Sequence, residues 1–418
     1  MGQLHKKFTD GQVKDLLARY LERKVKRAYI QEILGLKRRR FCQLVSRYKE
    51  NPAAFSIRYS RKRPTRGLDA DVEANILKEL RQEKALILNK EVPIRRYNYS
   101  YIKDQLEEGH LQKVSLPTII ARAKEHGFYM KRPKRKAHDR EVLTDYAGQL
   151  IQHDSSHHLW APAAREKWYL ITSLDDYSRM ILYADLIKQE TSWAHIMSLQ
   201  SVFLKYGLPY SYYVDCHSIF RFVQGRDSLW REHKFLTDET DPQWKRVLDD
   251  CGVKVTYALS PQAKGKIERP YQWLQDRMVR TCVRNNISDI RQARATLGEE
   301  VQRYNYRQRH STTQEVPFFR FQRALREKIS LFREFTVRSP YKSVKDIFSL
   351  RAARTVDPYR RVSFKNLVIK VNHVTPGEVV DIRVYHSENG LSELRFWNKD
   401  GLADVHQVKT ADLKGVQF

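Results

Sequence analysis

The sequence predicts a multidomain protein whose central part is an α/β domain with a mixed five-stranded sheet. Up to about residue 128, apolar residues recur at helical spacing. From about residue 148, three strand-like runs come first, and helical and strand-like segments then alternate, which is typical of a mixed sheet. After about residue 355, short strands alternate with turns, which predicts a small β-barrel over residues 355–418.

The composition indicates a folded protein that binds nucleic acid. At roughly 100–200 residues per domain, 418 residues allow two to four domains. Hydrophobic residues make up 41% of the chain, which is enough to bury real cores and excludes a disordered chain. The formal net charge is +28, and such an excess repels itself unless a polyanion offsets it. Nucleic acid is therefore the expected partner, and a merely basic soluble protein is the alternative.

The cysteines favour a reducing compartment. They form no CxxC pair, so we expect neither a disulfide framework nor a zinc site. No apolar run approaches 18 residues and the first residues are polar, so we expect no membrane partner and no signal peptide.

Residues 1–57 are expected to form a helix-turn-helix DNA-binding domain. Thr9 is a candidate cap for the first helix, and Gly35 separates two later apolar stripes at helical spacing. The helix after Gly35 opens with a cluster of cations whose members are expected to face the major groove, Arg38, Arg39 and Arg40. An ordinary αα-hairpin is the alternative.

A second helical, helix-turn-helix-like DNA-binding domain is expected over residues 68–129. In its last helix, Ser115 is a candidate cap, Pro117 lies in the first turn and Gly127 follows the end. A basic segment, 130–147, is expected to link it to an α/β domain that spans 148–330.

The expected elements of the α/β domain and the barrel follow from local patterns. Strands are expected at 148–160, 168–178, 179–187, 210–217 and 253–260. Helices are expected at 190–207, 242–252, 263–284 and within 298–330. Pro376-Gly377 and Asn389-Gly390 are turn signals between the strands of the barrel.

Three acids stand where the predicted sheet would gather them. Asp154 belongs to the first strand, Asp215 lies at the end of the fourth, and Glu268 lies in the first turns of the helix after the fifth. Open sheets place sites at the carboxyl ends of their strands. Three gathered carboxylates repel one another unless cations offset them, and Mg²⁺ prefers oxygen ligands. Two such ions about 3.5–4 Å apart stabilise the attacking and leaving oxygens of a phosphodiester displacement.

The segment around Glu268 is the most specific motif, SPQAKGKIERPYQWLQDR at 260–277. Three cations surround the acid, and we expect Lys264, Lys266 and Arg269 to hold DNA phosphates beside the metals. A solvated basic face is the alternative for these cations.

Here the sequence resembles the DDE transposases of bacterial insertion sequences, in the retroviral-integrase superfamily. The resemblance rests on two strands that each carry an Asp, followed by a helix that carries SPQAKGKIER. It also rests on the later segment QRYNYRQRHSTTQEVPFFRF. It implies an RNase H-like core in which Asp154, Asp215 and Glu268 hold two Mg²⁺ ions, for which Mn²⁺ can substitute. It further implies a polynucleotidyl transferase that acts on double-stranded DNA, at terminal repeats and at a target, as a homo-oligomer on DNA in the bacterial cytoplasm, associated with the nucleoid.

The sequence departs from the family pattern around the second acid. Asn-Gly often follows that acid, but VDCHSIF stands here. The spacing from Asp215 to Glu268 is also longer than usual, which predicts an insertion at about 216–241. A DNA-binding regulator that has lost the activity is therefore the main alternative. An RNase H-like nuclease that never joins strands is a weaker one.

Other polar and aromatic residues near the acids are expected to be structural. We expect Asp175 and Asp176 to stabilise a turn between strands rather than to bind metal. Oxygen suits Mg²⁺ better than imidazole, so structural or DNA-contacting roles are expected for His153, His157 and His158, and polar packing for His217. Tyr271 and Trp273 are expected in the core.

Overall fold

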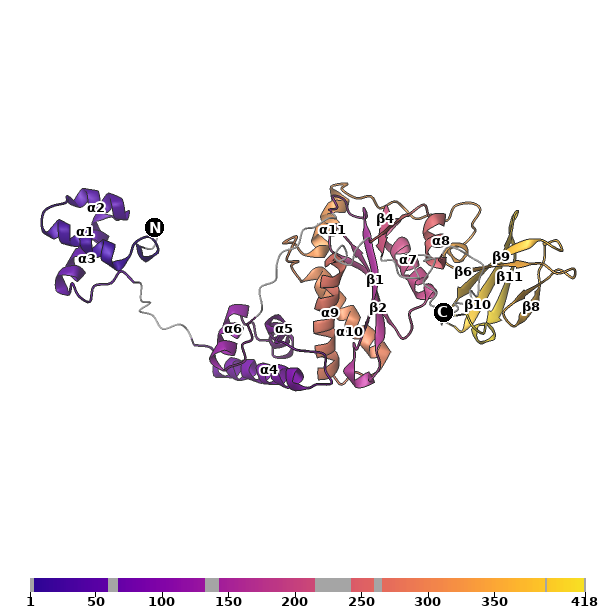
Figure 1. The fold of residues 1–418 in the computed structure, drawn as a ribbon, viewed down its shortest axis with the longest axis horizontal. Helices are drawn as coiled ribbons and strands as arrows, with labels where there is room; N and C mark the ends of the chain where they lie inside the picture. The colour runs from indigo at the N-terminus through magenta and orange to yellow at the C-terminus, as the bar shows by residue number, and fades with distance from the viewer. Residues whose placement is uncertain are drawn as a thin grey trace, which may run out of the picture. The chain divides into compact units, whose positions relative to one another are not determined.

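The computed structural model divides the chain into two compact units, residues 1–73 and 74–418, which are described separately below. The order and labels of the elements are given in Figure 1. For 265–268 only the backbone is described. The residues that the structure describes are 4–58, 67–131, 143–214, 242–258, 265–387 and 389–416.

The smaller unit contains three helices around a compact apolar core. They are α1 (Asp10–Leu21), α2 (Arg27–Leu34) and α3 (Arg38–Glu50). Thr9 caps α1, because its side chain accepts a hydrogen bond from the backbone N–H of Gln12, as expected. Gly35 ends α2 with a φ of +63°, a left-handed conformation that glycine adopts without strain. The core is built from Val13, Leu17, Ile30, Leu34, Phe41 and Leu44.

The larger unit is built around a five-stranded mixed sheet, as predicted. The strand order is β3-β2-β1-β4-β5; β2 lies antiparallel to β1 and β3, whereas β4 lies parallel to β1 and β5. The strands are β1 (Ile151–His158), β2 (Trp168–Asp175), β3 (Ile181–Ile187), β4 (Ser211–Val214) and β5 (Lys254–Tyr257). The central position of β1 gives it a hydrogen-bonded neighbour on each side.

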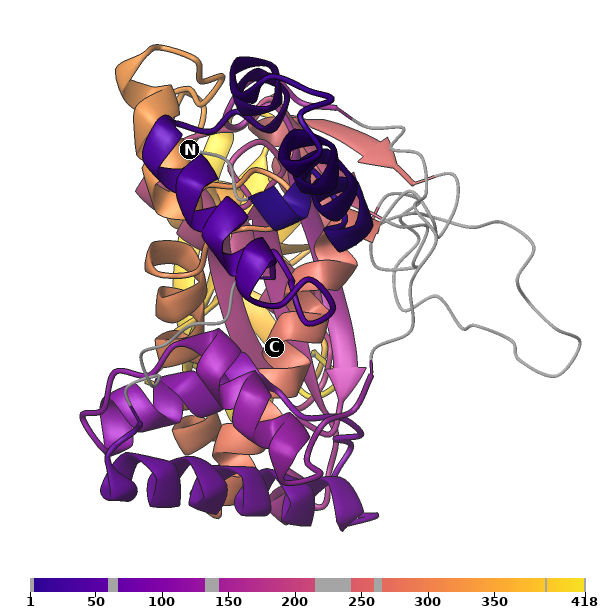
Figure 2. The same ribbon diagram turned by 90° about the vertical axis from the view of Figure 1, so that its left-hand side faces the viewer.

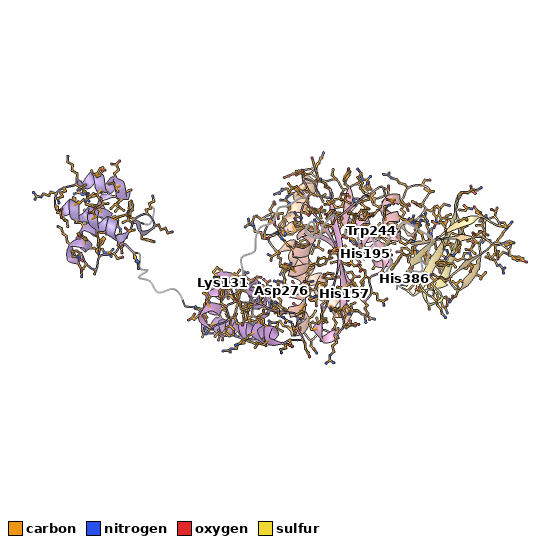
Figure 3. All side chains as sticks on the ribbon, viewed as in Figure 1. Lys131, His157, His195, Trp244, Asp276 and His386 are labelled. Carbon is orange, nitrogen blue, oxygen red and sulfur yellow. The ribbon has the colours of Figure 1, made fainter. Side chains whose placement is uncertain are left out.

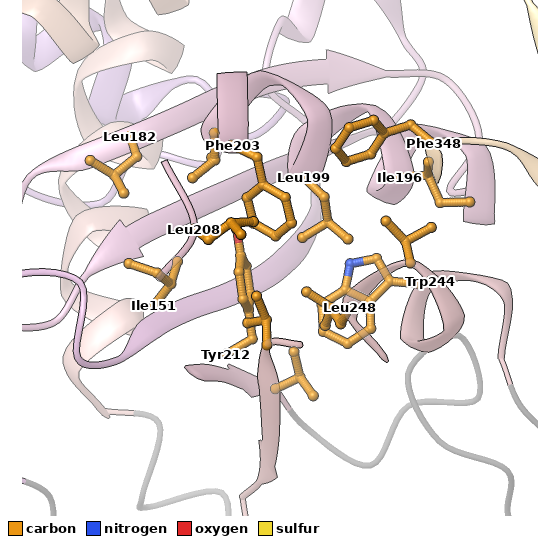
Figure 4. Packing of buried hydrophobic residues seen from close by; sticks show 14 of the residues in the cluster. Ile151, Leu182, Ile196, Leu199, Phe203, Leu208, Tyr212, Trp244, Leu248 and Phe348 are labelled. Carbon is orange, nitrogen blue, oxygen red and sulfur yellow. The ribbon is translucent and has the colours of Figure 1, made fainter. Parts of the chain in front are cut away.

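Helices cover both faces of this sheet. On one face, α7 (Ser192–Tyr206) and α8 (Gln243–Asp250) pack through an aromatic-rich cluster that includes Phe203, Tyr212 and Trp244 (Figure 4). On the other face, α9 (Gly265–Arg284) and α10 (Ile290–Tyr306) pack through a second cluster. Burial of these two apolar faces is the main favourable contribution to folding of the sheet.

Three further helices follow one another in the chain; α4 and α5 pack against the C-terminal part of α9, and α6 packs on α5 (Figures 1 and 2). They are α4 (Ala70–Leu88), α5 (Tyr99–Gly109) and α6 (Leu116–Glu125). As expected, Ser115 caps α6 by accepting a hydrogen bond from the Thr118 N–H, and Gly127 follows the helix with a positive φ.

Buried ion pairs carry the contact between α9 and the α4–α5 helices. The guanidinium of Arg280 is fully buried and donates to Glu83 of α4, to Asp276 and to the backbone carbonyl of Arg96. Arg277, exposed by 1%, donates to Asp104 of α5 and to Glu300 of α10. Charges taken out of water need such partners, because each unpaired ion costs several kcal/mol.

The C-terminal part is made of β-strands, but the expected closed barrel is not what forms. The described residues contain a four-stranded antiparallel sheet, β11-β10-β9-β6, and a separate two-stranded hairpin, β7-β8, and neither closes on itself. The predicted turn at Asn389-Gly390 joins β9 to β10. The strands are β6 (Leu350–Thr355), β7 (Arg361–Phe364), β8 (Leu367–Lys370), β9 (Val379–His386), β10 (Leu391–Asn398) and β11 (Gly401–Lys409).

The barrel expectation failed because a local strand pattern does not encode which outer strands meet. Strands β7 and β8 are four residues each and pair with one another through a tight turn at Lys365, so they leave β6 and β11 as the edges of the larger sheet. Two short helices, α11 (Pro317–Arg326) and α12 (Val344–Ile347), lie between α10 and this region in the chain.

Among the described residues, no helix combines the length and the apolar character that a membrane crossing requires.

We predict that Arg280→Met destabilises the larger unit by about 3–5 kcal/mol, because the buried carboxylate of Glu83 loses its cation. Urea unfolding, followed by tryptophan fluorescence, measures this loss. The matched control is Arg307→Met, since Arg307 pairs with Glu108 of α5 while 72% of its side chain is exposed. That change should cost less than about 1 kcal/mol. Equal losses in the two variants would contradict the prediction.

Candidate active site

Asp154 lies half-buried in the central strand of the five-stranded sheet. It stands opposite Thr172 of the antiparallel strand β2. Side chains alternate along a strand, and the two neighbours of Asp154 contact residues of α7 or of the segment before it. Asp154 therefore faces the other side of the sheet, which α9 covers.

Helix α9 runs along β1 and is hydrogen-bonded to it at two places. The Tyr271 hydroxyl donates to the backbone carbonyl of Asp154 at 2.6 Å, and Gln275 Nε2 donates to Ser156 Oγ at 3.2 Å. Four helical residues span about 6 Å and two strand residues about 6.6 Å, so the two contacts match in spacing. The first turn of α9, which contains Glu268, thus continues past the Asp154 end of this contact.

The remaining parts of the predicted acid triad lie outside what the structure describes. Asp215 follows the last described residue of β4, and the predicted insertion at 216–241 and His217 also lie in that gap. Glu268 has a described backbone in α9, but its side chain is outside the described set, as is that of Lys266; Lys264 is outside altogether. Within the described residues, no three His, Cys, Asp or Glu side chains are grouped to hold a metal ion.

A buried polar chain lies on the opposite face of β1. His153 Nδ1 is 2.9 Å from Ser173 Oγ, and His153 Nε2 is 2.8 Å from His195 Nδ1. His195 Nε2 is in turn 3.1 Å from Glu190, which also accepts a hydrogen bond from Ser155. Figure 3 labels His195 on α7 and Trp244 on α8, and the Trp244 ring stacks on His153 at 5.7 Å.

This hydrogen-bonded network gives His153 a structural role, one of the two roles that were expected for it. The other two histidines of β1 also pack against aromatic rings: His157 stacks on Tyr169 at 4.2 Å, and His158 meets Trp160 edge to face at 5.3 Å. Burial lowers the pKa of His158.

Asp175 and Asp176 stabilise the turn between β2 and β3, as expected. Asp175 is fully buried and accepts hydrogen bonds from the backbone N–H groups of Gly148 and Ser178 at 2.8 and 2.9 Å. Asp176 accepts from Arg179 at 2.7 Å, in a buried ion pair. Burial raises the pKa of Asp175 to about 6, against the opposing effect of its hydrogen bonds.

The described DNA-binding candidates are exposed. Arg38, Arg39 and Arg40 form the first turn of α3 and are exposed to solvent. Arg269, next to Glu268 in α9, is exposed and donates to Thr312 Oγ1 at 2.9 Å. Both groups of cations are therefore accessible to a phosphate backbone.

Sequence reasoning missed the contacts that link distant segments. The His153–His195 contact joins residues 42 apart, and no local motif marks it. Tyr271 was expected only as a core residue, and it is indeed only 6% exposed. The hydrogen bond from its hydroxyl to the backbone carbonyl of Asp154 was not predicted. The basic residues of α9 gave no signal that two of them are buried.

Two curated proteins match the chain in sequence. "Putative transposase y4bF" of Sinorhizobium fredii is 24% identical over 307 residues, which are 73% of this chain and 63% of the relative. "Transposase for insertion sequence IS1202" of Streptococcus pneumoniae is 28% identical over 239 residues, which are 57% of this chain and 45% of the relative. The chain is related to transposases. It spans less than two thirds of the length of either relative.

Among solved structures, two from the comparison are integrase assemblies with low sequence identity to this chain. No family model matches the chain. A chain of the simian T-cell lymphotropic virus intasome in complex with PP2A regulatory subunit B56 gamma is 12% identical, with a TM-score of 0.35 over 72% of this chain and 90% of that one. The HTLV-2 integrase catalytic core domain in complex with magnesium, in its trimeric form, is 14% identical, with a TM-score of 0.31 over 43% and 98%.

We predict that Asp175 makes the stability of the larger unit fall as pH rises from about 4 to about 6. Its folded-state pKa of about 6 lies above the value of 3.8 expected when unfolded, so only the folded state holds the proton in this window. The contribution is fully present below about pH 4 and is lost as pH rises through 6. Thermal unfolding across this range measures the effect.

The Asp175→Asn variant should lack this fall in stability with pH, because its amide does not titrate. Asp145→Asn changes an exposed residue of the preceding loop and should keep the wild-type profile. If the thermal stability of Asp175→Asn fell with pH as that of the wild type does, Asp175 would not be the group responsible.

Proposed function

We propose that the chain is a DNA transposase that binds the terminal inverted repeats of its element, nicks the element ends by metal-dependent hydrolysis, and joins the freed 3′-hydroxyls to target DNA. Its relation to two transposases supports this function. The observation that carries the proposal is the place of Asp154. Its strand lies at the centre of a mixed sheet, on the face covered by the helix in whose first turn Glu268 stands.

The strand register supports Asp215 as the second acid. Strands β1 and β4 pair Ile151 with Tyr212 and Gln152 with Tyr213, an offset of 61 positions. The same offset relates position 154 to position 215. We propose that Asp215 keeps this offset; its carboxylate would then lie beside that of Asp154, because neighbouring strands lie about 4.8 Å apart.

The donor chemistry fits Mg²⁺. All three proposed ligands, Asp154, Asp215 and Glu268, are carboxylates, which hard divalent cations prefer over nitrogen or sulfur. Together these three acids would hold the two ions. When bound, the ions offset the negative charge that builds up on the transferred phosphoryl group. The carboxylates fix the geometry, so that positioning and electrostatics carry the reaction.

The proposed reaction has two in-line displacements at phosphorus. In the first, a water molecule loses a proton as its oxygen bonds to phosphorus at the element end; the bond from phosphorus to the 3′-oxygen of the element breaks, and that oxygen takes up a proton to become the 3′-hydroxyl. In the second, this hydroxyl loses its proton as its oxygen bonds to a phosphorus of the target, and the target's own 3′-oxygen leaves and takes up a proton. The joining step exchanges one phosphodiester bond for another, so it needs no external energy source.

The remaining regions are proposed to handle DNA and subunits. Residues 1–57 would read the terminal repeat through Arg38, Arg39 and Arg40, with residues 68–129 as a second helical contact. Lys264, Lys266 and Arg269 would hold phosphates beside the catalytic acids. The C-terminal strands would position DNA or a second subunit. Because two element ends are processed together, a homo-oligomer on DNA is expected, in the bacterial cytoplasm.

We predict that Asp154→Asn slows both nicking and joining by on the order of 10³-fold. The substrate is a labelled duplex that carries the DNA flanking the coding sequence, incubated with Mg²⁺ or Mn²⁺, and products are resolved on denaturing gels. The matched control is Asp185→Asn in the neighbouring strand β3, where the carboxylate pairs with Arg294 at 3.0 Å. It should keep most of the activity.

The outcomes of this assay also separate the alternatives. Specific binding without cleavage by the wild-type protein would favour a silent DNA-binding regulator, which the VDCHSIF segment makes the main rival. Cleavage without joining would favour a plain nuclease. Wild-type activity in Asp154→Asn would remove the basis of the proposed site.

We predict that replacing Arg38, Arg39 and Arg40 together with alanine weakens binding to the terminal duplex by more than tenfold. Each phosphate contact that is lost should also reduce the slope of log K against log salt by about 0.9. Fluorescence anisotropy at several salt concentrations measures both quantities. The control removes the same charge from the same unit at Arg19, Arg23 and Lys24. Similar losses in both triple variants would indicate general electrostatics rather than contact by α3.

A further inference from the structure

The hydroxyl of Tyr271 joins three elements at the position of Asp154. It donates to the Asp154 backbone carbonyl at 2.6 Å and accepts from Thr172 Oγ1 at 2.9 Å. Thr172 is the residue directly opposite Asp154 in the antiparallel pair β1–β2. One hydroxyl therefore ties α9 to both strands at the same level of the sheet. Tyr271 is only 6% exposed, so water competes little for these hydrogen bonds.

From this geometry we propose that Tyr271 is a positioning residue, which sets the first turn of α9 at a fixed distance from Asp154 and so completes the divalent-cation site. The inference rests on the proposed function. Glu268 precedes Tyr271 by three residues, a rise of about 4.5 Å along the helix. Pro270 lies between the two residues and has no N–H to bond the preceding turn, so the anchor at Tyr271 is what holds the first turn of α9 near the sheet.

The anchors of α9 are distributed so that Tyr271 controls its N-terminal part. Gln275 contacts Ser156 one turn further on, and Arg277 and Arg280 fix the second half of the helix through buried ion pairs. Loss of the Tyr271 hydroxyl leaves these contacts in place. The helix stays packed on the sheet, and only the position of its first turns relative to β1 becomes less fixed.

Packing alone does not explain a hydroxyl at this position. Tyr304 belongs to the same apolar cluster, and its hydroxyl has no hydrogen-bond partner among the described residues. A phenylalanine ring fills the same space as tyrosine in either place. The two sites therefore form a matched pair: each change removes one buried hydroxyl, but only one of the hydroxyls is bonded to the strand of Asp154.

The test compares Tyr271→Phe with Tyr304→Phe in the full chain. Calorimetric titration with Mn²⁺ measures cation affinity without reference to activity. We expect Tyr271→Phe to weaken Mn²⁺ binding by about tenfold or more, as changes to groups that orient metal ligands do, and Tyr304→Phe to bind like the wild type. Melting temperatures without metal should stay within about 4 °C of the wild type for both.

Activity provides a second readout with a specific signature. Nicking by Tyr271→Phe should require a higher Mg²⁺ concentration for half-maximal rate, and excess Mg²⁺ should restore most of it. Thr172→Val removes the donor that orients the tyrosine hydroxyl, and it should shift the Mg²⁺ requirement in the same direction by a smaller factor. This second variant keeps the test decisive if Tyr271→Phe folds poorly.

Failure of the inference and failure of the proposed function are distinguishable. If the wild-type protein nicks DNA and both Tyr271→Phe and Thr172→Val keep its Mn²⁺ affinity and Mg²⁺ requirement, the positioning role is wrong and the function stands. If the wild type neither binds Mn²⁺ nor nicks DNA, the proposed function itself fails.

Discussion

Helix α9 buries both apolar side chains and guanidinium groups, and the larger unit depends on a suitable partner for each. One side of the helix presents Leu274 and Met278 to the sheet, where both are fully buried. The other side carries Arg277 and Arg280, whose guanidinium groups are also withdrawn from water. Desolvated cations are tolerable only beside acceptors, so the α4–α5 helices, with their inward-facing acids, are an obligatory cover for the helix.

Strand β1 has polar side chains on both faces of the sheet, and the two sets have different roles. Asp154 faces α9, where the proposed chemistry requires access to solvent and cations. His153, one residue earlier, faces α7 and is sealed into a chain of hydrogen bonds with Ser173 and His195. The two-residue period of a strand makes this division automatic. The buried chain then holds the backbone of the strand that carries the proposed ligand.

Local periodicity was sufficient to predict most helices and strands of this protein, including the order of the five strands along the chain. The caps at Thr9 and Ser115 were also predictable, because a side-chain acceptor at a helix start acts over three residues. Pairings between distant segments were not. Neither the His153–His195 contact nor the burial of Arg280 leaves a local pattern, since both depend on what tertiary packing places opposite them. The open C-terminal sheet escaped prediction for the same reason.

The buried guanidinium groups also limit how freely the regions of this protein can be exchanged between relatives. Residues 1–73 form their own compact unit, whose apolar core draws only on side chains between Leu4 and Ile57. The α4–α6 helices are different. A transplanted version would have to supply carboxylates at the places of Glu83 and Asp104, or the recipient's α9 would be left with uncompensated positive charge. Recombination breakpoints between these helices and α9 are therefore thermodynamically unfavourable.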